Sequence, residues 1–228
     1  MYGSIVLEGD SGASTPAAVA ELRRELLALD LDLADPDRVA TIRALTDLTN
    51  TIGALQSQLV SDLDASRRAR DDEAGIPREE RRGVGALVAW ARRESPHAGQ
   101  VAVGVATAVV REMRHTFSAM CAGVLSEYRA RLLVTETACL SREDRAAVDN
   151  AVCADLAALE GVGSRRLAGW ARRVGYALDP VSAVRRVARA ETDRFVSLRP
   201  APDWWATARS PRQSPASSSP PRRRCAPG

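Results

Sequence analysis

The side chains of this sequence that could take part in acid–base or metal chemistry begin with its two histidines. Histidine has an ordinary pKa near neutral pH and is the commonest metal ligand. His97 directly follows Ser95-Pro96 at the expected start of a helix, and His115 lies at an expected junction between two helices. Helix capping or surface placement explains both positions. We therefore predict no catalytic and no metal-binding role for either histidine.

The segment from Ser141 to Asp144 is a second candidate for chemistry. Glu143 and Asp144 could form a general acid–base pair, and Ser141 could be a nucleophile. However, Ser141 is not within a G-x-S-x-G motif and has no histidine near it in the sequence. A serine followed three residues later by an acidic residue is also typical of a capped helix start. We interpret Ser141 as a helix cap, and we predict no catalytic residue and no cofactor.

The remaining candidate metal ligands are Cys121, Cys139, Cys153 and Cys225. They form no C-x-x-C pair and no histidine lies at ligand spacing, so we expect reduced, buried thiols rather than a zinc site. The first 14 residues lack the features of a secretory signal, and no stretch reaches the ~18 consecutive apolar residues of a membrane span. We expect a cytoplasmic protein without a membrane segment, and the sequence indicates no small-molecule substrate.

The elements that position these residues are expected to be helices. Apolar residues make up 45% of the 228 residues but aromatic residues only 4%, so the core must be built mainly from Ala, Val and Leu. Ala and Leu are strong helix formers. We predict an all-α domain of about eight helices over residues 15–203, with one short strand at residues 195–199. Residues 1–14 and the low-complexity basic tail, residues 204–228, are expected to be disordered.

The longest expected helix covers residues 36–65 and begins at Asp35-Pro36. Large apolar residues recur along it at steps of three and four, and these are Val39, Ile42, Leu45, Leu48, Ile52, Leu55, Leu59 and Leu63. The stripe is close to a heptad pattern. It could pack within the chain, which is the more common outcome, or pair with a second copy to form a homodimer. The charged residues 66–83 are expected to connect this helix to the next.

Charge argues against strong DNA binding by the folded part. All 32 basic residues are arginine, and the net charge is +3. From Arg199 onward, six arginines and one aspartate give the tail +5, which leaves residues 1–198 near −2. Nucleic-acid-binding domains usually carry their basic excess in the folded part. A patch across the last two expected helices is still a candidate for weak, non-specific phosphate contact, and its members are Arg166, Arg173, Arg185 and Arg189.

Residues 84–111 contain two expected helices joined by a short turn, as in helix-turn-helix proteins. The second helix would then enter the major groove of DNA. Base readout needs polar side chains on one face, and this helix offers only Gln100, Thr107 and Arg111 beside small apolar residues. We therefore interpret it as a buried helix.

Several ordered segments resemble an actinobacterial family called domain of unknown function 222, the thirteen-E-twelve repeat proteins. The segments are SPHAG, REMRHTFSAMCAGVLSEYRA and ETACLSREDRA within Ala91–Asp149, and DPVSAVRRVARAETDRFVSLRPAPD over Asp179–Asp203. The resemblance covers residues 20–203. It implies a helical accessory domain that is usually followed by an HNH endonuclease domain.

The nuclease of that family has no counterpart in this sequence. HNH chemistry needs metal-binding and water-activating groups on a ββα hairpin, whereas both histidines lie in the helical region. After Asp203 the sequence departs from the family pattern, and Trp204-Trp205 leads into SPRQSPASSSPPRRRCAPG. We hypothesise that residues 204–228 are the frameshifted end of a longer gene, and that the chain is truncated before the HNH domain.

Three hypotheses for function follow from these observations. The first is a non-catalytic, truncated member of the HNH-linked family that associates with DNA. The second is a helical interaction module that self-associates through residues 36–65, and the third is a gene fragment without function. In each of them the chain is not an enzyme. The charge of residues 1–198 favours the second and third hypotheses over DNA binding.

Overall fold

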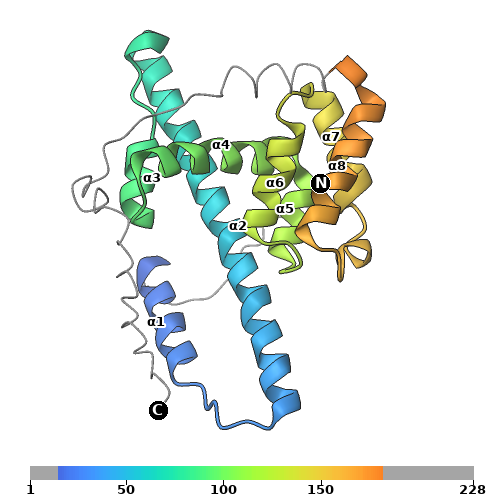
Figure 1. Ribbon diagram of the computed structural model, residues 1–228. Helices are drawn as coiled ribbons and strands as arrows, with labels where there is room; N and C mark the ends of the chain where they lie inside the picture. The colour runs from blue at the N-terminus through green and yellow to red at the C-terminus, as the bar shows by residue number, and fades with distance from the viewer. Residues whose placement is uncertain (1–14, 182–228) are drawn as a thin grey trace, which may run out of the picture. The chain divides into compact units, whose positions relative to one another are not determined.

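A computed structural model describes residues 15–181, and this part of the chain is all-α, as predicted (Figure 1). Its elements are α1 (Thr15–Leu27), α2 (Asp35–Glu73), the 3-10 helix η1 (Arg78–Glu80), α3 (Gly85–Arg92), α4 (Pro96–Glu112), α5 (Arg114–Cys121), α6 (Glu127–Thr137), α7 (Arg142–Cys153), the 3-10 helix η2 (Ala157–Leu159) and α8 (Ser164–Leu178). The predictions for residues 1–14, 195–199 and 204–228 lie outside the described residues. No helix among residues 15–181 is long and apolar enough to cross a membrane.

The main hydrophobic core lies where α4 to α8 meet. Its buried side chains are aliphatic or methionine, and they include Ala119, Ala130, Val109, Val148, Leu125, Leu133, Leu167, Met113 and Met120. Phe117 and Trp170 pack against this core while remaining partly exposed. Aromatic side chains therefore close the edge of the core rather than fill it, which fits a sequence poor in aromatic residues.

Helices α3 and α4 pack at very short distance because each presents a glycine to the other. A Cβ atom on Gly99 would lie 2.2 Å from the carbonyl oxygen of Gly85, so no larger residue fits there. Helix α4 also buries Val103, Ala106 and Val109. This burial agrees with the interpretation of the segment as a buried helix rather than a DNA-recognition helix.

Serine side chains begin three of the helices, as expected for Ser95 and Ser141. The Oγ atoms of Ser95, Ser126 and Ser141 each accept a hydrogen bond from the backbone N–H three residues later, at 3.0–3.3 Å. Such caps stabilise a helix by about 1 kcal/mol each. The start expected at Asp35-Pro36 is off by one position, because Asp35 is the first residue of α2 and Ala34 precedes it.

Helix α2 is longer than predicted because the first part of the expected connector is helical. Ion pairs between residues four apart join Arg68 to Asp64 at 2.8 Å and Arg67 to Asp71 at 3.2 Å on its last turns. Pairs of this spacing stabilise a helix by about 0.2–0.5 kcal/mol each. The chain leaves the helix where Gly75 adopts a φ of 65°, which glycine accepts without strain.

Candidate interaction surface on helix α2

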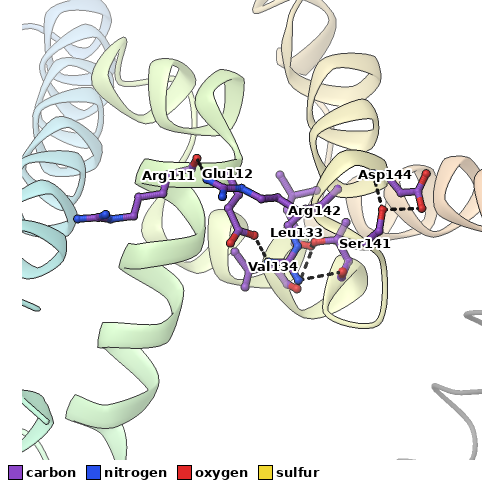
Figure 2. A network of polar contacts seen from close by, with 9 residues as sticks. Arg111, Glu112, Leu133, Val134, Ser141, Arg142 and Asp144 are labelled. Atoms are coloured by element: carbon purple, nitrogen blue, oxygen red, sulfur yellow. Dashed lines mark hydrogen bonds and ion pairs between the residues drawn. The ribbon is translucent and has the colours of Figure 1, made fainter. Parts of the chain in front are cut away.

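Helix α2 contacts the rest of the described chain through small and polar residues. Its buried residues are Gly53, Ala54, Ser57, Ser61, Asp64 and Asp71. The hydroxyl of Ser57 donates to the carbonyl oxygen of Gly53 at 2.9 Å, and Ser61 accepts from Nε of Arg111 at 3.2 Å. Arg111 extends from α4 towards α2 (Figure 2). We call residues 53, 54, 57, 61 and 64 the core face of α2.

The large apolar residues of α2 lie on the opposite side of the helix. At 100° per residue, their mean direction is roughly 160° from that of the core face. We call this set the leucine face, and its members are Leu45, Ile52, Leu55, Leu59 and Leu63. All five are exposed, Leu55 to 59% and Leu59 to 68%. Of the eight apolar residues in the predicted stripe only Leu48 is not exposed, so the stripe is not buried within residues 15–181.

A shallow apolar groove extends the leucine face towards α3. It has a volume of about 240 Å³, and its apolar lining consists of Leu59, Val60, Leu63, Leu87, Val88 and Ala91. Trp90, one turn after Leu87 on α3, is 83% exposed. Leu87, which lines the groove, is 58% exposed, so it continues the row of exposed apolar side chains from α2 onto α3. Exposed apolar surface of this kind is typical of an interaction site.

Helix α2 itself places no charged side chain on the edges of the leucine face between Leu45 and Leu59. A guanidinium nitrogen of Arg92, on α3, lies 3.5 Å from the side-chain oxygen of Gln56, and Arg92 is ion-paired with Glu94 and Glu127. Helical spacing places Thr49 and Gln56 along one edge, and Thr51 and Gln58 along the other. In paired helices, the residues at such edges face each other across the contact and select the partner. Because the edge residues of α2 are uncharged and Arg92 is ion-paired, two identical faces can approach without an unpaired charge on either helix edge.

Two of the four arginines predicted to contact nucleic acid lie within the described residues. Arg166 and Arg173 are both exposed on α8, seven residues apart and therefore on one side of the helix. Neighbouring Arg172 is instead engaged, because its guanidinium donates to both carboxylate oxygens of Glu136 at 2.6 and 3.0 Å. Arg185 and Arg189 lie outside residues 15–181, so the predicted patch stays a prediction.

The serine that the sequence offered as a nucleophile belongs to a polar network between α4 and α7 (Figure 2). Ser141 Oγ accepts from the N–H of Asp144 at 3.0 Å and donates to its carboxylate at 2.8 Å. Nearby, Arg145 pairs with Glu112 and donates to the carbonyl oxygen of Thr137 at 3.4 Å. These contacts confirm that Ser141 caps its helix, and the network ties the start of α7 to α4 and α6.

The start of α5, where His115 lies, is capped by a carboxylate from α7. Buried Asp149 accepts from the backbone N–H groups of His115 and Thr116, both at 2.8 Å, and from the Thr116 hydroxyl at 2.6 Å. The N-terminal dipole of a helix favours such a negative charge. The backbone of His115 is therefore part of a helix cap, as the capping interpretation expected. His97, by contrast, is exposed in the first turn of α4.

The cysteines differ in exposure. Cys153 is buried, Cys139 is half-buried and Cys121 is exposed, so the expectation of buried thiols is wrong for Cys121. Burial raises the pKa of the Cys153 thiol to about 11. A thiol with so high a pKa is protonated at neutral pH and is a poor nucleophile. Cys225 lies outside the described residues.

Comparisons with known proteins add no information about this surface. No protein-family model, no curated protein and no solved structure matches the chain. The resemblance to domain of unknown function 222 therefore stays a prediction. Within residues 15–181, no group of three His, Cys, Asp or Glu side chains is placed as a metal ion would require.

Proposed function

We propose that this chain is a helical interaction module that self-associates through the leucine face of α2. The supporting observation is that α2 uses small residues for its own core and leaves its large apolar residues exposed on the opposite side. Exposed apolar surface of this extent costs free energy in water, at about 25 cal/mol per Å². A protein partner that covers the leucine face removes that cost.

The pattern of the leucine face favours a second copy of the chain as the partner. Leu45, Ile52 and Leu59 recur at steps of seven, and Leu55 lies three residues after Ile52. Such spacing suits a partner helix with the same repeat. The uncharged edges fit a homodimer as well, because identical charges would otherwise face each other in one of the two possible orientations.

The size of the surface also suits a homodimer. A standard interface buries roughly 800 Å² on each partner. The leucine face and Leu87 supply six exposed apolar side chains for the centre of such an interface.

Sedimentation velocity of the full chain across a concentration series tests this proposal. We expect dimer at protein concentrations on the order of 10 µM. The variant Leu59→Glu should weaken association by roughly 30-fold or more, because a carboxylate would be buried in an apolar contact. The matched control is Tyr128→Glu, which removes a side chain of similar exposure, 63%, from α6. It should leave association unchanged.

Two results would contradict the proposal. A wild-type chain that is monomeric at every concentration would mean that another segment of the chain, or a different protein, covers the leucine face. Equal weakening by Leu59→Glu and Tyr128→Glu would place the contact elsewhere. Far-ultraviolet circular dichroism of both variants establishes that each remains folded.

A further inference from the structure

A second surface feature, separate from the leucine face, is a charged cavity at the end of α2. The cavity has a volume of about 440 Å³ and lies between the last turns of α2, residues 78–84 and the start of α4. Its charged lining consists of Arg67, Arg68, Arg78, Arg81, Arg82, Asp64, Asp71 and Asp72. Five arginines and three aspartates give the lining a net charge of +2.

Each of the three aspartates is already engaged with one arginine. The pairs are Asp64 with Arg68 at 2.8 Å, Asp71 with Arg67 at 3.2 Å and Asp72 with Arg81 at 2.6 Å. Arg78 and Arg82 have no acidic partner among residues 15–181. The excess positive charge of the cavity is therefore carried by these two guanidinium groups.

Two other arginines that line the cavity, Arg81 and Arg67, are held in place by the fold, beside the exposed Arg78 and Arg82. Nε of Arg81 donates to the carbonyl oxygen of Ile76 at 2.9 Å, and the Arg81 side chain is only 24% exposed. Nε of Arg67 is buried and makes no hydrogen bond, although Asp71 lies within ion-pair distance. The Nε–H group of Arg67 is thus left without a hydrogen-bond acceptor, although Asp71 neutralises the charge of Arg67. Fixed, paired arginines beside two unpaired ones give the cavity a positive potential, which attracts anions.

We propose that this cavity binds a phosphoester group, with Arg78 and Arg82 as its direct ligands. The planar guanidinium fork matches two phosphate oxygens at once, and it stays charged at every physiological pH. The cavity volume falls within the ~300–1,000 Å³ of small-molecule sites, so there is room beside the phosphate for an organic group. Gln100, which is exposed, offers that group an amide, whereas Val84 and Val103 line the cavity but are almost fully buried.

The same phosphoester chemistry occurs in small molecules and in nucleic-acid backbones. Both sources are tested on the full-length chain by isothermal titration calorimetry at low ionic strength. The probes are inorganic phosphate, adenosine monophosphate and a short DNA duplex. The test variant is Arg78→Gln with Arg82→Gln, and the matched control is Arg114→Gln with Arg131→Gln, two exposed arginines outside the cavity.

We expect saturable binding of adenosine monophosphate that falls about tenfold or more in the test variant and is unchanged in the control. A duplex whose binding depends on Arg78 and Arg82, without measurable binding of the two small probes, would identify a nucleic-acid backbone as the source of the phosphate. Retention of wild-type affinity for every probe in the test variant, or no binding of any probe by the wild type, would overturn the proposal.

A second variant separates an anion site from a structural charge cluster. Asp72→Asn removes the acidic partner of Arg81 and raises the lining charge from +2 to +3. The Asp72 side chain is exposed, so the folded state should tolerate the change. Affinity for the bound probe should rise several-fold, because a third guanidinium becomes free. An unchanged or lower affinity for the probe would count against the site.

Discussion

The two faces of helix α2 reverse the usual relation between residue size and burial. The core face buries Gly53, Ala54 and Ser57, whereas the leucine face exposes Leu55 and Leu59. Small buried residues let the helix backbone approach α4 and α5, and the fold gains close packing there. The large residues contribute little to that packing. The core face therefore stabilises the fold, whereas the leucine face is available to a partner.

The largest difference between the core face and the leucine face is expected for the neighbouring residues Ala54 and Leu55. Ala54→Glu should destabilise the folded state by about 4 kcal/mol or more, because it places a carboxylate without a partner in the core. Leu55→Glu should change the free energy of unfolding by less than about 0.5 kcal/mol, since Leu55 is exposed. Urea denaturation followed by circular dichroism, at concentrations below dimer formation, measures both. Equal destabilisation by the two variants would mean that the leucine face packs within the chain.

A large residue on the core face, or a small residue on the leucine face, should have a smaller effect than a buried carboxylate. Ser57→Leu should cost about 1–3 kcal/mol of stability, because the added atoms overpack the contact with the neighbouring helices. Leu59→Ser should leave monomer stability within about 0.5 kcal/mol and weaken association by roughly tenfold. Urea denaturation measures the stability of both variants, and sedimentation velocity measures their association. A Ser57→Leu protein as stable as wild type would refute close packing at the core face.

The smallest expected effect concerns salt. Contact through the leucine face should change in affinity by less than about threefold between low salt and 1 M NaCl, because α2 places no charge on its edges between Leu45 and Leu59 and nearby Arg92 is ion-paired. Phosphoester binding near Arg78 and Arg82 should instead weaken steeply over the same range. Sedimentation and calorimetry in matched salt series measure the two responses. Strongly salt-dependent association would show that charged residues form the contact.

Local signals in the sequence were sufficient for the fold class and for several helix starts. The caps at Ser95 and Ser141 are determined within four residues, so the pattern alone predicts them. The face that α2 buries is not a local property. Its apolar stripe predicted internal packing as the commoner outcome, whereas the small residues Gly53, Ala54 and Ser57 make the contact because they suit the surfaces of α4 and α5.

The arginine cavity was also beyond prediction from spacing. Residues 66–83 had the composition of a solvated connector, and nothing in their order shows which arginines lack a partner. The turn at Gly75 brings Arg78 and Arg82 to the same cavity as Arg67 and Arg68. The distances between side chains on the two sides of the turn determine which charges are neutralised. These distances cannot be read from the order of residues in the sequence.

The carboxylate of Asp149 has a consequence for the order in which the protein folds. Helix α5 has only eight residues, too few to be stable alone in water, and its first N–H groups bond to a side chain 33 to 34 positions later. During synthesis, α5 therefore lacks its cap until α7 has left the ribosome. A chain interrupted before Asp149 lacks this cap, so its α5 would be held only by its contacts with α2, α4 and α6.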